Sequence, residues 1–320
     1  MKKILFRAAL LACLCGSAMA AFPDKPLKLV VPYTPGGSAD MLARALAEGM
    51  GRQLGQAVVV ENKPGANTMI AASAVARAPA DGYTLLLASS ASMVLNPMLY
   101  RKISYDAQRD LRVLSVAAET PLVVVTNAQV PASNVRDFAA YAKANAGRLN
   151  YASVGLGNPL QLASEMLKIE LGIDLTHVPY NGSAPALASL LAGDVQLMVD
   201  VVSTSLPHIR SGKLKALAVT TRQRLAVLPD TPTVAESGSP DFHVVTWFGI
   251  AAPKGIAEAD AAKLQAAVSK VLADPQFRRN FETQGLLVLQ PQQPAETTAY
   301  VERERTRWAT VIKSHNIVLD

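Results

Sequence analysis

Two glycine-rich segments contain the residue types best suited to binding chemistry. The first covers residues 33–40 (YTPGGSAD) and the second residues 153–159 (SVGLGNP), and each lies between a strand-like apolar run and a helical pattern. Glycine lets the backbone approach a ligand closely, and a helix N-terminus presents unpaired N–H groups at the positive end of the helix dipole. Either segment alone could be an ordinary tight turn. One in each half of an α/β chain predicts an anion site that needs no lysine or arginine.

Asp40 lies in the first turn of the helix that follows the first segment. A carboxylate there complements the helix dipole, but it would repel a bound carboxylate. We therefore interpret Asp40 as a residue that orders the loop. Recognition of an amine is the alternative.

The sequence contains none of the common catalytic or phosphate-binding motifs. There is no G-x-S-x-G elbow, no H-E-x-x-H motif and no G-x-x-x-x-G-K-[ST] loop. The three residues of a serine triad need not be close in sequence, so a triad is not excluded, but no motif supports one. We expect a protein that is not an enzyme and has no cofactor or metal. The four histidines are interpreted as surface or hydrogen-bonded interior residues: His177, His208, His243 and His315.

The first twenty residues have the pattern of a secretory signal peptide. Three basic residues lie within the first seven positions, an apolar run covers residues 8–14, and residues 18–20 (AMA) suit a signal peptidase. The apolar run is too short to cross a bilayer. We expect cleavage after Ala20 and export to the periplasm. Lipoprotein processing at Cys13, which ends a loose lipobox, is the alternative.

Composition excludes several other classes of protein. Half of the 320 residues are hydrophobic and 18% are charged, which excludes a disordered chain. The net charge of +6 includes three basic residues of the expected signal peptide, so 28 basic and 25 acidic residues remain, scattered along the chain. This pattern is not that of a nucleic-acid-binding protein, and no later stretch is long enough to insert into a membrane. Both cysteines, Cys13 and Cys15, lie in the expected signal peptide.

Strand-like and helix-like segments alternate after residue 26. Helices are expected over residues 68–77 and 160–171, and over 133–147 with Ser133 as its cap; Leu42, Leu46 and Met50 form another helical stripe. Strands separated by single helices predict right-handed crossovers and a mainly parallel sheet. The expected strands cover residues 27–32, 57–60, 84–87, 122–125, 149–153, 175–178, 195–199 and 214–220.

The last part of the chain has a different pattern. Residues 257–273, 275–284 and 294–313 are predicted to form three helices with little strand between them, which cannot form a third sheet. We expect them to cover the first lobe. The predicted fold is α/β with two lobes, each a mainly parallel sheet flanked by helices, and a cleft between them. Residues 21–120 plus 250–320 form lobe 1, and residues 121–249 form lobe 2.

A series of short motifs runs in order along the chain. They are FPDKP at 22–26, VVP at 30–32 with the PGGSAD that follows, VVVENKPGA at 58–66, DGYTL at 81–85, NP at 96–97, HVPY at 177–180, PHIRSGK at 207–213, PDTPTVAE at 229–236 and WFG at 247–249. In these motifs the chain resembles the periplasmic substrate-binding proteins of tripartite tricarboxylate transporters, the Bug-type receptors. The resemblance covers essentially all of the chain after residue 20. It implies a type II periplasmic-binding-protein-like fold that closes on a small carboxylate as a Venus flytrap does.

The resemblance also implies which residues bind the ligand. In the family, the two glycine loops hold one ligand carboxylate through backbone amides and ordered water. The Ser89-Ser90 loop and Asp200 match positions that face the cleft. Tyr33, Tyr180 and Asn181 would form walls of the cleft. The residues implied are Tyr33, Gly36, Gly37, Ser38, Ala39, Ser89, Ser90, Ser153, Gly155, Leu156, Gly157, Asn158, Gln161, Tyr180 and Asp200.

The second loop departs from the family pattern, which usually reads Gly-x-Gly-Ser-x-x-His. Here residues 155–161 read GLGNPLQ, so Asn158 replaces serine and the neutral amide of Gln161 replaces an imidazole. Backbone amides should still hold the carboxylate, and the change affects the distal part of the ligand. Tyr33, Leu156 and Met93 would make the cleft fairly apolar, which favours an aliphatic or aromatic carboxylate over citrate.

Three functions are compatible with this pattern. The leading hypothesis is a monomeric periplasmic protein that captures a small organic carboxylate and delivers it to the membrane permease of a tripartite transporter. The alternative is a ligand-binding sensor that signals to a membrane kinase. A secreted hydrolase comes third, because it would need a nucleophile within hydrogen-bond reach of a base in the cleft.

Overall fold

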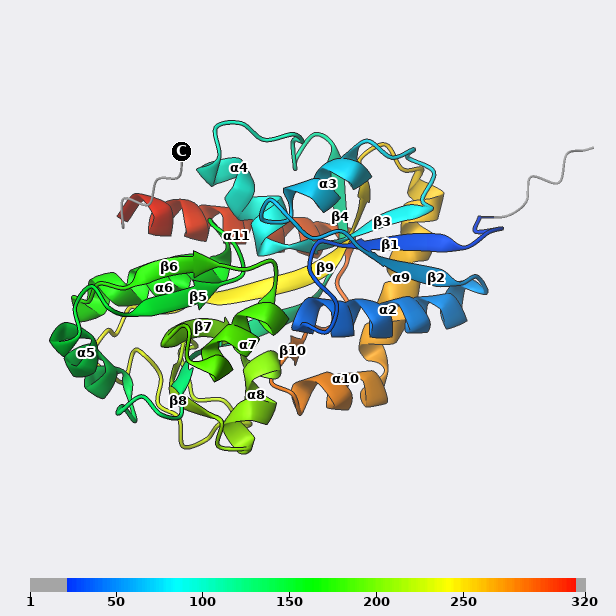
Figure 1. Ribbon diagram of the computed structural model, residues 1–320. Helices are drawn as coiled ribbons and strands as arrows, with labels where there is room; N and C mark the ends of the chain where they lie inside the picture. The colour runs from blue at the N-terminus through cyan, green and yellow to red at the C-terminus, as the bar shows by residue number, and fades with distance from the viewer. Residues whose placement is uncertain (1–21, 315–320) are drawn as a thin grey trace, which may run out of the picture.

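The computed structural model describes residues 22–314, and Figure 1 shows their arrangement. The expected signal peptide, with its two cysteines and the cleavage site after Ala20, lies outside the described residues. Within the part of the chain that the structure describes, no helix is both long and apolar enough to cross a membrane.

The first of two connected sheets is parallel at its outer edge and antiparallel at its centre. Its strands are β1 (Leu27–Val31), β2 (Val58–Asn62), β3 (Thr84–Ser89), β4 (Leu111–Asn127), β9 (Val245–Pro253) and β10 (Leu287–Val288). β1 pairs in parallel with β2 and β3, whereas β9 runs antiparallel between β3 and β4. The short β10 pairs antiparallel with β4.

The second sheet shares β4 with the first. It contains β5 (Asn150–Ser153), β6 (Thr176–Pro179), β7 (Leu197–Val201) and β8 (Leu214–Val219). β5 pairs in parallel with β6 and β7, and the second half of β4 pairs antiparallel with β7 and β8. Within β4 the partner changes between Pro121, which faces Val245 of β9, and Leu122, which faces Val201 of β7. One long strand therefore connects the two sheets directly.

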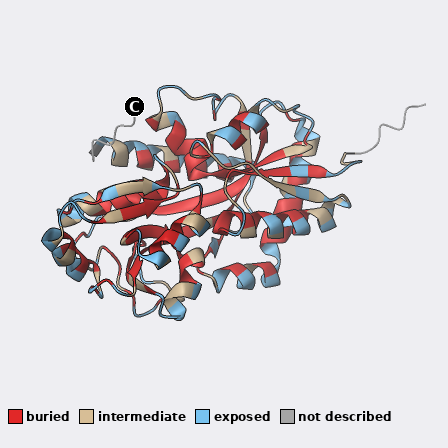
Figure 2. Cartoon of the chain, viewed as in Figure 1, coloured by how far each residue is buried: buried red, intermediate tan, exposed pale blue. Residues whose placement is uncertain are grey.

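Helices cover both sheets and bury their apolar faces against them (Figure 2). In α2, the predicted stripe of Leu42, Leu46 and Met50 is fully buried, and the helix ends at Gly55 in the left-handed conformation. The helices are α2 (Ser38–Leu54), α3 (Met69–Ala76), the π-helical turn η1 (Ala91–Leu95), α4 (Asn96–Leu99), α5 (Val135–Ala144), α6 (Pro159–Leu171), α7 (Ser183–Ala192), α8 (Val202–Arg210), α9 (Glu258–Ala273), α10 (Pro275–Glu282) and α11 (Pro294–Ser314).

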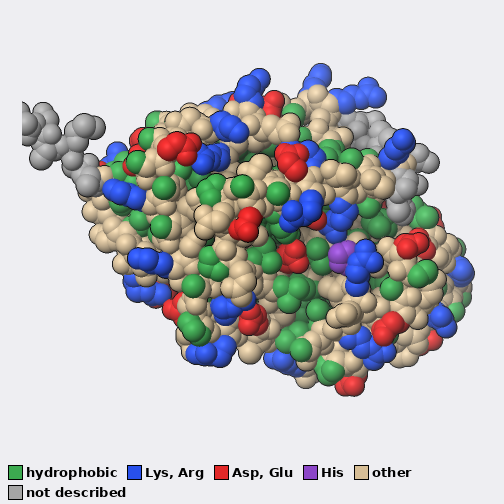
Figure 3. Space-filling model, turned by 180° about the vertical axis from the view of Figure 1, so that it is seen from behind, with side chains coloured by type: hydrophobic (Ala, Val, Ile, Leu, Met, Phe, Trp, Pro, Cys, Tyr) green, Lys and Arg blue, Asp and Glu red, His purple; other side chains and the backbone are tan. Residues whose placement is uncertain are grey.

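The three C-terminal helices return to the first sheet. α9 packs against α2 and β4, and α10 packs against α9 and β10. α11 packs against β4 and η1, and the Arg307 Nη2 atom donates to the carbonyl oxygen of Val245, 3.1 Å away. Basic and acidic side chains are interspersed over the face shown in Figure 3.

Two details differ from the sequence-based expectations. Helix α5 is capped by Asn134, whose Oδ1 accepts from the N–H groups of Arg136 and Asp137, and not by Ser133. Ser133 instead donates to the carboxylate of Asp137. The predicted strands also omitted β9 and the first part of β4, and β9 is a mainly apolar run that is buried along its whole length.

At Gly249, strand β9 lies too close to β4 to leave room for a side chain. A Cβ atom built there would lie 2.3 Å from the Ser115 carbonyl oxygen, a backbone atom that cannot move aside independently. We expect Gly249→Ala to lower the free energy of unfolding by about 1–3 kcal/mol, measured by urea denaturation. Gly255→Ala is the control, since its Cβ would meet only the Ala80 side chain at an ordinary 3.4 Å. Equal stability of the two variants would contradict this packing.

Candidate functional site

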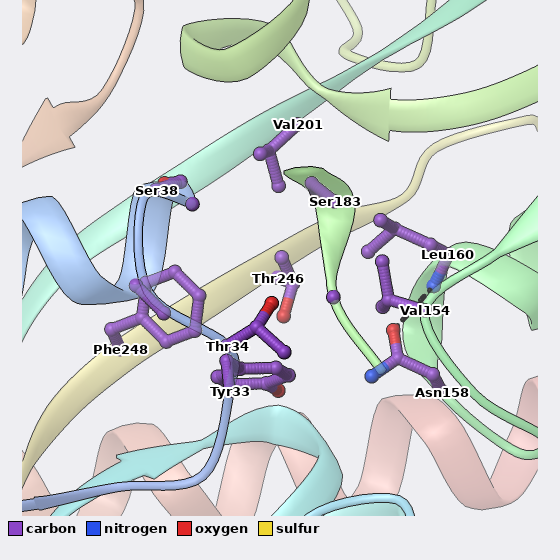
Figure 4. A pocket seen from close by; sticks show the side chains of 13 residues that line it. Tyr33, Thr34, Ser38, Val154, Asn158, Leu160, Ser183, Val201, Thr246 and Phe248 are labelled. Atoms are coloured by element: carbon purple, nitrogen blue, oxygen red, sulfur yellow. Dashed lines mark hydrogen bonds between the residues drawn. The ribbon is translucent and has the colours of Figure 1, made fainter. Parts of the chain in front are cut away.

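A small cavity lies where the ends of strands β1, β5, β7 and β9 come together. Its volume is about 30 Å³, which is little more than one or two water molecules need. Figure 4 shows the side chains that surround it. The lining residues are Tyr33, Thr34, Gly37, Ser38, Ala39, Val154, Asn158, Leu160, Gly182, Ser183, Val201, Thr246 and Phe248.

Four helices begin at this cavity. The lining includes the first residues of α2 and α7, the N-terminal turn of α6, and Val201, which is the N-cap of α8. No side chain caps the N-terminus of α2, α7 or α8. The first N–H groups of a helix have no partner within it, and they form the positive end of its dipole. The cavity is therefore surrounded by backbone donors that favour an anion.

The N-terminus of α6 differs because Asn158 caps it. The Asn158 Oδ1 atom accepts from the N–H group of Leu160 at 3.1 Å, a contact drawn in Figure 4. Asn158 itself is buried. It presents its side-chain amide at the wall of the cavity while satisfying one helix donor.

The first glycine loop is ordered by Asp40, as the sequence predicted. The Asp40 carboxylate accepts from the Gly36 N–H group at 3.0 Å, from Arg44 Nε at 2.9 Å and from Asn62 Nδ2 at 2.9 Å. Burial would raise the pKa of Asp40, but the hydrogen bonds from Arg44, Gly36 and Asn62 outweigh it and hold that pKa below its ordinary value. The carboxylate thus remains charged and paired with Arg44, away from the lining.

Hydroxyl groups and two aromatic rings form the rest of the wall. The ring of Tyr33 meets Phe248 edge to face, with centroids 6.0 Å apart, and the Tyr33 hydroxyl donates to Ser89 Oγ at 3.3 Å. Burial raises the pKa of Tyr33, so this hydroxyl stays protonated. Among the described residues, Thr34 Oγ1 and Ser38 Oγ are buried without a hydrogen-bond partner. These two oxygens are the side-chain groups most ready to bind a ligand.

No lining residue carries a charged side chain. Within the described residues, no cluster of three or more histidine, aspartate or glutamate side chains could hold a metal ion. Any attraction for an anion must therefore come from backbone amides and hydroxyls.

Only part of the set predicted from the sequence lies in the lining. Gly36 and the 155–157 loop residues lie next to lining residues, although Leu156 is 45% exposed. Ser89 and Ser90 lie behind the wall, where Ser90 Oγ accepts from Thr246 Oγ1 at 2.9 Å and from the Trp247 N–H group at 3.0 Å. The predicted residues that line the cavity are Tyr33, Gly37, Ser38, Ala39 and Asn158.

Gln161 and Tyr180 contact neighbours of the cavity but do not line it. The Gln161 Oε1 atom accepts from the Gly157 N–H group at 3.1 Å, so this side chain braces the second loop from behind. The Tyr180 hydroxyl donates to Ser189 Oγ at 2.6 Å. Met93, a further expected wall, is buried in the core.

Asp200 lies at the end of β7, fully buried behind the wall. Its carboxylate accepts from Ser183 Oγ at 2.6 Å, Thr204 Oγ1 at 2.6 Å and Ser205 Oγ at 2.8 Å. Burial raises the pKa of Asp200, and these hydroxyl donors act against that rise. Asp200 thus influences the cavity through Ser183 and the first turns of α7 and α8.

Sequence reasoning missed several lining residues. Gly182 and Ser183 follow β6 in the same strand, glycine, helix order as the two recognised loops, so that pattern could have identified them. Thr246 and Phe248 come from β9, which had no recognisable strand pattern. The other lining residues outside the predicted set are Thr34, Val154, Leu160 and Val201.

One serine and histidine pair lies beside the second loop. Ser153 Oγ is 2.5 Å from His177 Nε2, and the imidazole stacks on Tyr151 with ring centroids 4.8 Å apart. Ser153 is completely buried and does not line the cavity, so its hydroxyl is not accessible to a substrate there. The pair has the hydrogen-bond distance of a nucleophile and a base, but it lies outside the cavity, so it supports the loop and offers no reactive hydroxyl to a ligand there.

Comparison with known proteins agrees with this geometry. Residues 42–317 match the family model described as the tripartite tricarboxylate transporter family receptor. Protein BugT of Bordetella pertussis is 36% identical over 293 residues, which is 91% of this chain and 90% of that protein.

Two solved structures are also similar. Rpa4515 of R. palustris with adipate has a TM-score of 0.89 at 34% identity, covering 93% of this chain and 99% of that one. MatC (Rpa3494) of Rhodopseudomonas palustris with bound malate has a TM-score of 0.87 at 34% identity, covering 91% and 100%.

The fold is that of an α/β periplasmic binding protein, and the family that the chain matches is one of solute receptors. The chain belongs to the tripartite tricarboxylate transporter receptor family. This confirms the resemblance and the fold class predicted from the motifs, and it assigns the chain to transport receptors and not to enzymes.

Burial lowers the pKa of His177 below its ordinary value of 6.5. The unfolded chain therefore binds a proton at this imidazole more readily, and the contribution of His177 to stability is full above about pH 6.5 and is lost as the pH falls. We expect His177→Gln to reduce the drop in unfolding free energy between about pH 7.5 and 5.5. Urea denaturation of both proteins at the two pH values measures it. An identical drop in both proteins would contradict a lowered pKa of His177 in the folded protein.

Proposed function

We propose that this protein captures a small organic carboxylate in the cavity and delivers it to the membrane permease of a tripartite transporter. The observation that carries the proposal is the meeting of four helix N-termini at a cavity with no charged side chain in its lining. A carboxylate accepts hydrogen bonds strongly from backbone N–H groups at such positions. Exclusion of water from the site would strengthen the attraction between the carboxylate and these N–H groups.

The ligand carboxylate would bind near the start of α2. The N–H groups at the start of this helix have no side-chain cap, and the unpartnered Ser38 Oγ and Thr34 Oγ1 atoms are close by in the lining. Asp40 does not compete, because its carboxylate is already held by Gly36 and Arg44. This arrangement leaves donors for one carboxylate from solution.

We further propose that the site opens and closes between two lobes, residues 21–120 plus 250–320 and residues 121–249. The cavity, at about 30 Å³, is small for a carboxylate of several carbon atoms, which supports a separation of its walls when one enters. The Thr34 N–H group donates to the Asn181 carbonyl oxygen at 3.4 Å across this boundary. The bend would lie where β4 changes its partners, at Pro121 and Leu122.

The walls favour a ligand with an apolar body. Tyr33, Phe248, Val154, Leu160 and Val201 all contribute to the lining. Relatives of the same fold were solved with adipate and with malate. We propose an aliphatic or aromatic carboxylate, bound in the periplasm by a monomer.

Direct binding tests this function. Isothermal titration calorimetry with adipate, malate, hexanoate and benzoate should give saturable binding for at least one of them. In a deletion strain, uptake of that carboxylate should fall. No binding by any carboxylate would count heavily against the proposal, and binding without loss of uptake would favour a sensor.

Gly182 gives a sharper test of the site. A Cβ atom there would lie 2.4 Å from Thr34 Oγ1, so alanine would force the two walls apart. We expect Gly182→Ala to weaken carboxylate binding by about tenfold or more, which is about 1.4 kcal/mol. Gly193, at the other end of α7, also has a positive φ but has no atom within 4 Å of a built Cβ. Gly193→Ala should therefore bind as the wild type does, and equal losses in both variants would contradict the proposed contact.

A further inference from the structure

A strained turn lies immediately before α3. Ala66, Asn67 and Thr68 all have positive φ values, of 44°, 44° and 74°, in the region that favours glycine. Such conformations cost free energy and persist only where surrounding contacts hold them. The turn is far from the glycine loops in sequence, so its contacts reveal what holds it.

Asn96 fixes the orientation of the Asn67 side chain. Asn96 is fully buried, and its Nδ2 atom donates to the Asn67 carbonyl oxygen at 2.7 Å and to Thr68 Oγ1 at 3.2 Å. The Asn67 Nδ2 atom donates back to Asn96 Oδ1 at 2.8 Å. Because the amide nitrogen of Asn67 faces Asn96, its oxygen must face the other way.

The Asn67 oxygen faces the second glycine loop. It accepts from Asn158 Nδ2 at 3.2 Å, and this orients Asn158 so that its own oxygen caps the Leu160 N–H group. The backbone is equally close, since a Cβ atom built on Gly155 would lie 3.3 Å from Asn67 Oδ1. A second bond parallels the first, because the Tyr100 hydroxyl donates to the Leu156 carbonyl oxygen at 2.6 Å.

We propose that Asn67 is a positioning residue that latches residues 155–158 over the cavity and thereby slows escape of the ligand. The proposal rests on the proposed function for its effect on binding. The strained turn places the Asn67 amide oxygen, which belongs to one proposed lobe, against residues 155–158 of the other lobe. The latch can form only when the two sides are together, so it stabilises the closed form.

A purely structural role for Asn67 is the alternative, and two substitutions separate the roles. Asn67→Gly removes the amide but suits the positive φ, whereas Asn67→Ala removes the amide and keeps the strain. If Asn67 is only a turn former, Asn67→Gly loses its bond to Asn96 but leaves the 155–158 loop as it is in the wild type. If Asn67 is a latch, both variants lose the same loop contact.

Hydrogen–deuterium exchange on the ligand-free protein tests the latch without any ligand. We expect amide exchange over residues 155–162 to accelerate by about tenfold in both variants, the effect of losing one or two hydrogen bonds. Tyr100→Phe should accelerate the same segment, because it removes the parallel bond to Leu156. Unchanged exchange over this segment in Asn67→Gly would overturn the proposal.

Dissociation kinetics test the effect on the ligand. Trp247 lies between the lining residues Thr246 and Phe248 in β9, so stopped-flow tryptophan fluorescence is the readout for release of whichever of adipate, malate, hexanoate or benzoate binds the wild type. We expect the dissociation rate to rise by about tenfold in both Asn67 variants with a smaller change in the association rate. If the wild type binds none of the four carboxylates, the proposed function is contradicted. The hydrogen–deuterium exchange experiment then still tests the latch. Equal ligand dissociation rates in the wild type and Asn67→Gly would overturn the proposal that Asn67 latches the loop.

Discussion

Unpaired N–H groups at helix N-termini are the constraint on which this site depends. Every α-helix leaves such groups at its start, and a buried helix start must find an acceptor for them. Here α2, α6, α7 and α8 all begin at one cavity, and only α6 has a side-chain cap. The positive ends of the helices thus meet in a space lined by hydroxyls, aromatic rings and aliphatic groups. That combination would favour an anion without a basic side chain, so charge counts along the chain would give no indication of such a site.

The protein's own carboxylates are arranged so that they do not occupy these donors. Asp40 is paired with Arg44 and the Gly36 N–H group, and Asp200 is buried behind the wall under three hydroxyl donors. Each is close to a helix start in sequence, yet neither side chain enters the cavity. The proposed carboxylate ligand would therefore meet no competing carboxylate of the protein in the cavity.

The strands β4 and β9 hold the two sides of the site in place. Both are long, largely buried strands, and they pack so closely at Gly249 that no side chain fits there. β4 passes from one sheet to the other at Pro121 and Leu122, and β9 brings Thr246 and Phe248 to the cavity. A few residues of β4 therefore link the two sheets, while the loops at the strand ends contribute to the cavity walls. Motion between the sheets would alter the walls far more than the strands.

The sequence by itself determined many of the local elements and pointed to the glycine loops as the place of the site. The stripe in α2, the strand, glycine, helix segments and the loop-ordering role of Asp40 depend on backbone conformation and on neighbours within a few residues, so they could be read from the chain. The motifs also predicted the family. Only the tertiary structure decided which of the candidate residues meet. Asp200 and Ser90 lie behind the wall and Leu156 is partly exposed, whereas Ser183, Thr246 and Phe248 line the cavity. The physical reason is that the direction of a side chain at the end of a strand depends on how that strand pairs with distant ones. The pairing of β9 with β3 and β4, like the contact of Asn67 with Asn158, joins parts of the chain that no local pattern connects.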